Sequence, residues 1–570
     1  MAVQLSGWFK SKPQGQRLDR DDWLMRVLLL LLIVWLAVTL VLPLGWLLVK
    51  SFQDPAGQFI GLDNYVVYFS TPSLFDSLFN SLFVACVTTL IVIPWAYLYA
   101  YALRRTCMPV RGFFYAVAMI PILAPSLLPA ISLIYLFGNQ GFLKAVLMGE
   151  SIYGPIGIIV AQVFYCFPHA LMILVAALSI ADARHYEAAK ALRTPSLRTF
   201  LTVTLPGTKY GLISAAFVVF TLSITDFGIA KVIGGRFNVL ATDIFKQVIG
   251  QQNFQMGAVV GFVLLMPAMA AFAVDRWIQG KQVALLSAKV VPLIPVRQRG
   301  RDWSFLVVCS LTALLILAIL GVSVWASLLT RWPYNLNLTL ANYSFANFDT
   351  DGWRSYWNSL EMASWTAVFG TVLIFVEAYL TEKTRGFGLA RGLAQFMAML
   401  PMAVPGLVLG LAYIFFFNAP GNPFGFLYAT LAIMVINSIT HFYTVGHITA
   451  TTALKQMDRE FEAVSASLKV SLLRTFGKVT TPICLPAILD VSMYLFVNAM
   501  TTVSAVIFLY SSQTRVASVS IIHMDEAGFT ASAAAMSVVI VLTSAAVKLL
   551  HWAATALLEG KTQRWRARTI

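Results

Sequence analysis

A series of nearly uncharged apolar blocks, each long enough to cross a lipid bilayer, constrains this chain more than any other feature. A helix needs about 20 residues to span the hydrocarbon core of a membrane. Only 11% of the 570 residues are charged, whereas about a quarter are charged in a typical soluble protein. We therefore predict an all-α integral membrane protein with about twelve transmembrane helices. The blocks occupy residues 24–49, 80–103, 113–138, 153–180, 211–235, 257–278, 304–330, 359–381, 392–417, 424–450, 486–511 and 529–557.

The basic residues gather in alternate segments between these blocks, as the positive-inside rule requires. Residues 51–79 contain no Lys or Arg, whereas segments 181–209 and 451–485 are rich in both. This asymmetry predicts that both termini and these two segments face the cytoplasm. The same asymmetry explains the net charge of +15. We therefore expect the chain to lie in a lipid bilayer and to bind no nucleic acid. Block 24–49 is too long for the core of a signal peptide, and we expect it to be retained as a helix.

The chain repeats itself at a spacing of 276 to 280 residues. Six blocks separate the two copies of each repeated motif, so the copies have the same orientation in the membrane, as in a parallel repeat. We predict a first half at 1–280, a cytoplasmic linker at 281–303 and a second half at 304–570. The repeated motifs are Asn80-Ser81-Leu82 with Asn358-Ser359-Leu360, Pro121 and Pro125 with Pro401 and Pro405, and Arg198-Thr199-Phe200 with Arg474-Thr475-Phe476.

The most informative segment lies between the fourth and fifth blocks. It begins Glu187-Ala188-Ala189, continues to Leu192, and ends in Leu205-Pro206. At helical spacing the alanines and Leu192 form a small apolar face that another protein could approach closely. Glu187 near the start of the helix is favoured by the helix dipole and could pair with a cation of that partner.

The second half carries an altered copy of this segment in the equivalent place. It begins with Glu462-Ala463, continues to Leu468, and reaches Pro482. When the two copies are aligned on Arg-Thr-Phe, Glu462 stands one position earlier than Glu187. We interpret Glu462 as the counterpart of Glu187.

Both segments resemble the EAA loop of binding-protein-dependent ABC importer permeases, in which Glu-Ala-Ala is followed by a glycine and the loop ends in Leu-Pro. Arg193 and Lys469 stand where that family has glycine. The resemblance implies a type I importer permease fold in the bacterial inner membrane, with a short cytoplasmic helix in each half that docks into an ATPase subunit. It further implies two ATPase copies, a periplasmic substrate-binding protein and a small-molecule substrate. Because the sequence has no GxxxxGK[ST] loop, ATP hydrolysis is expected on separate subunits and this chain is not expected to be an enzyme.

The translocation path is expected to involve Asp226 and two pairs of prolines. An acid inside a membrane span usually faces a cavity or a partner, and Asp226 falls in the block that follows the first loop. Prolines free backbone carbonyls and kink helices, so Pro121 and Pro125, with Pro401 and Pro405, are candidates for a gate. Kinks that only shape the bundle are the alternative.

The cargo is assigned by resemblance. Fused permeases of this length resemble transporters of 2-aminoethylphosphonate or of ferric iron, and segments 225–235 and 462–468 are more similar to the first group. Ferric iron favours several hard oxygen ligands, and few acids lie in the predicted spans. An ion-coupled secondary transporter with two parallel halves is a further alternative, which the duplicated loops disfavour.

No cofactor, metal site or catalytic site is expected. His441 and His447 stand six residues apart, on different faces of a helix, and no Ser-His-Asp or H-E-x-x-H pattern is present. The cysteines form no CxxC pair and are interpreted as reduced packing residues. They are Cys86, Cys107, Cys166, Cys309 and Cys484.

The predicted topology can be tested with single cysteines. In a background without other cysteines, Ser196→Cys and Ser471→Cys are expected to resist a membrane-impermeant thiol reagent added to intact cells, because both positions face the cytoplasm. Permeabilised cells provide the control, in which both positions should react. Ready labelling in intact cells would contradict the topology.

Overall fold

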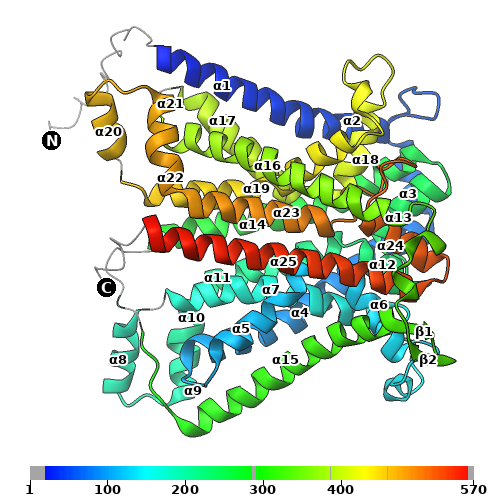
Figure 1. Ribbon diagram of the computed structural model, residues 1–570, viewed down its shortest axis with the longest axis horizontal. Coiled ribbons are helices and arrows are strands. Elements are labelled where there is room, and N and C mark those ends of the chain that lie inside the picture. Colours follow the sequence, from blue (N-terminus) through cyan, green and yellow to red (C-terminus); the bar gives the residue numbers. More distant parts are fainter. Residues whose placement is uncertain are drawn as a thin grey trace, which may run out of the picture.

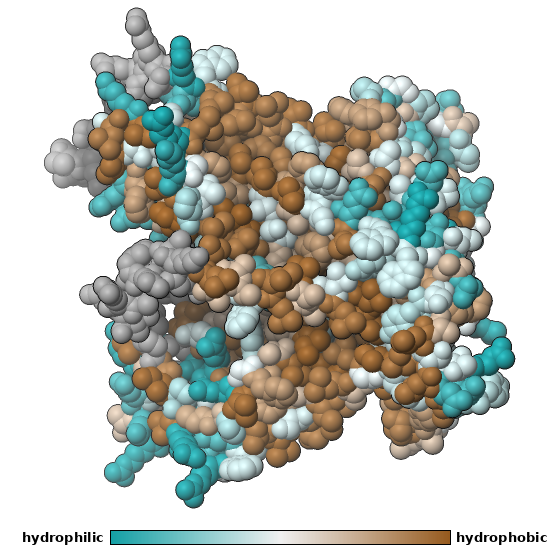
Figure 2. Space-filling model, in the orientation of Figure 1, coloured by the Kyte–Doolittle hydropathy of each residue, from teal (hydrophilic) through white to brown (hydrophobic). Residues whose placement is uncertain are grey.

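The computed structural model describes residues 20–180, 182–285, 291, 293–384, 387–458 and 460–562. Within these residues, eight helices are long and apolar enough to cross a membrane, and four bent helix pairs raise the number of candidate spans to twelve. This confirms the predicted all-α membrane class. Figure 2 shows a broad apolar surface across the middle of the molecule, with polar residues gathered towards the two ends.

The first half contains α1 (Arg20–Leu36), η1 (Ala37–Val41), α2 (Leu42–Ser51), α3 (Asp63–Ser70), α4 (Pro72–Arg105), α5 (Arg111–Met119), η2 (Ile120–Leu123), α6 (Leu127–Phe137), η3 (Lys144–Leu147), α7 (Pro155–Ser179), α8 (Ala183–Ala191), α9 (Ser196–Thr199), η4 (Phe200–Thr204), α10 (Leu205–Gly207), α11 (Lys209–Thr225), α12 (Gly228–Ile233), α13 (Leu240–Phe245), η5 (Lys246–Gly250) and α14 (Phe254–Leu285).

The second half contains α15 (Arg299–Leu328), β1 (Leu329–Arg331), β2 (Asn335–Leu338), η6 (Ala341–Tyr343), η7 (Phe345–Asn347), α16 (Arg354–Glu382), α17 (Gly388–Met399), η8 (Leu400–Ala403), α18 (Gly406–Phe417), η9 (Gly425–Leu427), α19 (Leu431–Gln456), α20 (Glu460–Ser467), α21 (Leu472–Thr475), η10 (Phe476–Thr480), α22 (Thr481–Ile483), α23 (Leu485–Thr501), α24 (Ala517–Glu526) and α25 (Thr530–Thr562). The antiparallel hairpin β1–β2 was not predicted.

The third span of each half is broken, whereas the sequence predicted a single kinked helix. The chain turns by 100° between η2 and α6 and by 113° between η8 and α18. The cause lies in the proline pairs, because the residue before a proline is driven out of the helical conformation. Ala124, which precedes Pro125, has ψ 143°, and Val404, which precedes Pro405, has ψ 115°.

The fifth span of each half is shorter than predicted. Helix α11 ends at Thr225 instead of continuing to residue 235, and α23 ends at Thr501 instead of 511. The next residues, Asp226 and Thr502, are extended, with ψ 127° and 137°. Hydropathy did not reveal these ends because the chain beyond them remains largely apolar.

The first helix of each half packs against the other half. Helix α1 lies along α16 and α17, whereas α15 lies along α4, α5 and α6. Buried Cys309 and Ala313 of α15 belong to one apolar cluster with residues of α4 and α7. Trp35 of α1 packs against Tyr443 of α19, with ring centroids 5.9 Å apart. The two halves are therefore interlocked through their first helices.

The short helices that resemble coupling segments gather at one end of the bundle. Figure 1 places α8, α9, α20 and α21 at this end, together with the start of α1 and the end of α25, while α3, α12, α13, α24 and the hairpin lie at the opposite end. We call the first of these the coupling end and the second the outer end.

Helices α8 and α20 both finish in a left-handed turn built without glycine. Arg193 has φ 51° and Lys469 has φ 53°. Directly after each of them, an amide bonds back over the end of the helix, from Thr194 to the carbonyl of Ala189 and from Val470 to that of Ser465, both at 2.9 Å. This is the hydrogen-bond pattern of a glycine-terminated helix, so the turn is retained although glycine is absent.

The left-handed turns predict a gain in stability on substitution. A side chain in this conformation costs about 1–2 kcal/mol, so Arg193→Gly and Lys469→Gly should each raise the free energy of unfolding by roughly 1 kcal/mol, less the added entropy of the unfolded glycine. Thermal denaturation of the purified protein in detergent measures the effect. Arg198→Gly, within helix α9, is the matched control and should be neutral or destabilising. Equal losses at all three positions would contradict the turn geometry.

Candidate functional site

Helix α8 is the first candidate coupling helix, and its start is defined by a side-chain cap. The carboxylate of Asp182 accepts a hydrogen bond from the backbone N–H of Arg184 at 3.1 Å. The Arg184 guanidinium bonds the same carboxylate, and together these bonds lower the pKa of Asp182 to about 2. The cap is therefore charged at any physiological pH, which favours the helix.

The residues singled out in this loop mostly point away from the bundle. Glu187, Ala188 and Pro206 are exposed, Leu205 is half-buried and Ala189 is buried. The side chains of Leu192 and Leu197 are 79% and 71% exposed. Isolated exposed leucines are ordinary, but two on one short loop offer apolar side chains that suit a protein partner.

Helix α20 presents a comparable surface in the second half. Leu468 is 70% exposed, and Phe461 and Val464 are also exposed. Ala463 and Pro482 are exposed.

Glu462 differs from Glu187, because it is partly buried and pairs within its own chain. Lys383 at the end of α16 lies 3.3 Å from the Glu462 carboxylate and donates to the carbonyl of Met457 at 3.1 Å. In the first half the cation at the equivalent place is Arg105, whose guanidinium lies 5.0 Å from the ring centre of Tyr186. Tyr186 and Glu462 are thus structural counterparts. The one-residue offset in the alignment was the sequence signal for this difference.

Each candidate coupling loop is also bonded to the other half, either at the start of that half's first helix or in the segment before it. In the second loop, the N–H of Leu472 donates to the carboxylate of Asp21 at 2.6 Å. In the first loop, the N–H of Ala183 donates to the carbonyl of Val291 at 2.9 Å. The loops are therefore fixed from both halves at once.

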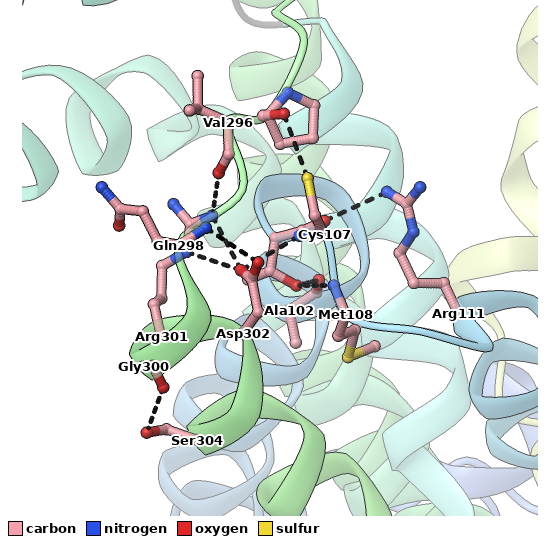
Figure 3. A network of polar contacts seen from close by, with 12 residues as sticks. Ala102, Cys107, Met108, Arg111, Val296, Gln298, Gly300, Arg301, Asp302 and Ser304 are labelled. Carbon is pink, nitrogen blue, oxygen red and sulfur yellow. Dashed lines mark hydrogen bonds and ion pairs between the residues drawn. The ribbon is translucent and has the colours of Figure 1, made fainter.

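The start of α15 is held by a polar network around Asp302, shown in Figure 3. The Asp302 carboxylate accepts from the backbone N–H of Cys107 at 3.2 Å and from that of Gln298 at 3.1 Å. Arg301 forms an ion pair with it at 3.0 Å. Because Cys107 follows α4, the network joins the linker region to the first half, and it gives Cys107 a structural position close to the predicted packing role.

The predicted path residues of the first half come together at the break in the third span. Asp226 follows α11 and accepts a hydrogen bond from the N–H of Ile229 at 2.9 Å. Its carboxylate also bonds the hydroxyl of Ser126, the residue after Pro125. Pro121 lies one turn earlier in η2. Pro401 and Pro405 occupy the same places in the second half.

Sequence reasoning missed a buried pair of ionisable groups in the second half. His447 of α19 forms a close contact with Glu377 of α16, and both side chains are fully buried. Within the part of the chain that the structure describes, His441 of the same helix forms no ion pair. The sequence pattern singled out the two histidines but not Glu377, which lies inside the apolar block 359–381 and belongs to a different helix.

Comparisons with known proteins give consistent results. The chain is 29% identical to the ferric transport system permease protein FbpB of Actinobacillus pleuropneumoniae, over 84% of this chain and 70% of that protein. It is 31% identical to the putative ferric transport system permease protein FbpB 1 of Haemophilus influenzae, over 77% of this chain and 70% of the relative. A solved bacterial alginate ABC transporter, in complex with alginate pentasaccharide-bound periplasmic protein, is 16% identical over 47% of this chain, with a TM-score of 0.39.

The description "binding-protein-dependent transport system inner membrane component" matches the chain twice, at residues 92–282 and 378–555. The two matches cover more than half of the chain and contain α8 and α20 in equivalent places. The chain therefore belongs to the family of binding-protein-dependent transport system inner membrane components, as a permease subunit of an ABC importer that carries both copies of the family's domain.

Proposed function

We propose that this single chain forms the whole membrane path of the importer, with one ATPase subunit docked on α8 and a second on α20. The observation that carries the proposal is the pair of apolar surfaces at the coupling end, centred on Leu192 and Leu468, which are 79% and 70% exposed. Burying one such leucine contributes about 1.5–3 kcal/mol. The coupling end would face the cytoplasm, and a periplasmic binding protein would dock at the outer end.

The two docking sites differ in their charged groups. Glu187 is exposed and free to meet a cation of an ATPase, whereas Glu462 already pairs with Lys383. Glu462 would then serve docking by fixing α20 against α16, in addition to any contact with the partner.

Docking can be tested by charge placed on the apolar surfaces. Leu192→Asp combined with Leu468→Asp should release the ATPase during purification and abolish transport, because a carboxylate would have to be buried in each interface. Glu187→Lys should weaken docking without changing thermal stability, whereas Glu462→Lys sets a cation beside Lys383 and should lower stability as well. Leu340→Asp, at the outer end and 72% exposed, is the matched control for ATPase binding, and the ATPase should stay bound in this variant. An intact, active complex of the double variant would refute the assignment.

For the cargo we favour 2-aminoethylphosphonate, a small zwitterion with an ammonium and an anionic phosphonate. Segment 225–235 resembles permeases of this group, and the carboxylate of Asp226 at the broken span is a suitable transient partner for an ammonium. Ferric iron is the second candidate, because the two relatives described above carry that description.

Uptake by a deletion strain distinguishes the two cargoes. Loss of labelled 2-aminoethylphosphonate uptake, with ferric iron uptake unchanged, is expected. Asp226→Asn should slow uptake about tenfold with normal membrane abundance, since one charge-assisted hydrogen bond contributes about 1–3 kcal/mol. Normal phosphonate uptake with defective iron uptake in the deletion strain would establish the iron transporter instead.

A further inference from the structure

The repeat builds the same close contact twice, with its two residue types exchanged. In the first half Ser126, at the start of α6, faces Gly228: a Cβ at Gly228 would lie 2.6 Å from the Ser126 hydroxyl. In the second half Gly406, at the start of α18, faces Ser504: a Cβ at Gly406 would lie 2.9 Å from the Ser504 hydroxyl. The junction between the broken third span and the end of the fifth span is therefore equivalent in the two halves.

The charges at these equivalent junctions differ. The first half has Asp226, which bonds Ser126 and the N–H of Ile229. In the second half Thr502 stands at the position of Asp226, with almost the same backbone angles. The acid is thus confined to one half.

The fourth span of each half carries a different ring beside this junction, an imidazole in the second half and a phenol in the first. His441 of α19 takes the place of Tyr165 of α7 at the repeat spacing of 276 residues. Its Nε2 atom would lie 3.1 Å from a Cβ at Gly406, so it borders the same junction. Among the described residues no hydrogen bond or ion pair to His441 is found, and its Nδ1 atom is buried without a partner. The hydroxyl of Ser504 and the backbone N–H of Ala505 border the same point beside Gly406.

The side chains around these junctions come from both halves of the chain. Tyr165, Asp226, His441 and Tyr494 are half-buried, so each keeps part of its surface accessible to solvent. Tyr165 lies within electrostatic range of both Asp226 and Tyr494. The ring of Tyr494 meets that of Phe442, the neighbour of His441, with centroids 6.2 Å apart. The ring of Phe442 in turn lies against that of His441, with centroids 4.6 Å apart.

We propose that these residues form a two-ended transient binding site for a small zwitterion on the translocation path, an inference that rests on the proposed cargo. Asp226 receives the ammonium from the side of the first half. His441, donating through Nε2, and the hydroxyl of Ser504 receive the anionic group from the side of the second half. Each end offers only one or two hydrogen bonds, so the site orients the cargo and releases it readily.

The test replaces His441 by a ring of similar size that has no N–H donor. His441→Phe should lower 2-aminoethylphosphonate uptake about tenfold, the loss expected for one charge-assisted hydrogen bond, and His441→Gln, which keeps a donor, should retain most of the uptake. In proteoliposomes with the ATPase, stimulation of ATP hydrolysis by the loaded binding protein should be unchanged in His441→Phe, because the site contacts cargo and not the coupling loops. His551→Phe, at a histidine that pairs with Asp490 on α23, is the control and should transport normally.

The possible results distinguish an error in the proposed binding site from an error in the cargo assignment. Wild-type uptake by His441→Phe, or a parallel fall of uptake and stimulated ATP hydrolysis, would overturn the binding site while the importer's cargo assignment stands. If deletion of the permease leaves 2-aminoethylphosphonate uptake intact, the cargo assignment is wrong and the zwitterion site is overturned with it.

Discussion

Inside a membrane, every backbone amide and carbonyl needs a hydrogen-bond partner within the protein. This requirement determines where the chain can leave the helical conformation. At the break in the ninth span, the hydroxyl of Thr444 stands between two groups that a continuous helix would join directly. It donates to the carbonyl of Ala398 at 2.8 Å and accepts from the N–H of Met402 at 3.2 Å. At the end of α11, the buried side chain of Gln162 donates to the carbonyl of Ser223 at 3.0 Å. Side chains of neighbouring helices thus make these irregular segments tolerable.

The same breaks determine which part of the fold and of the candidate sites the sequence could predict. Hydropathy and the repeated motifs predicted the spans and the two equivalent halves, since these depend on patterns many residues long. The end of α11 could not be predicted, because Gln162, whose side chain satisfies the carbonyl of Ser223, stands 61 residues away in the sequence. The pairing of Glu462 with Lys383 was missed for the same reason: 79 residues separate them, and the alignment offset was the only sign.

The interlocked first helices give the coupling loops a mechanical connection to both halves. A movement of the second loop must act on α1 through Asp21, and α1 is packed against the second half while its chain continues into the first. The first loop is linked through Val291 and the Asp302 network to α15 in the same way. A displacement at one loop is therefore transmitted across the boundary between halves through packed helices and hydrogen bonds, the kind of contiguous contact that can carry coupling.

Joining the halves in one polypeptide also allows equivalent positions to diverge, which two copies of an identical subunit could not do. The cation that anchors each coupling helix illustrates this point. Arg105 lies against the face of an aromatic ring, whereas Lys383, only 4% exposed, pairs with a carboxylate that is 22% exposed. A partly buried ion pair is screened little by salt, and losing one partner leaves the other charge unsatisfied. A cation on an aromatic ring loses only the attraction of the ring when the ring is removed. The two coupling helices are thus held by interactions of different kinds, and the two ends of the proposed zwitterion site follow the same pattern of divergence.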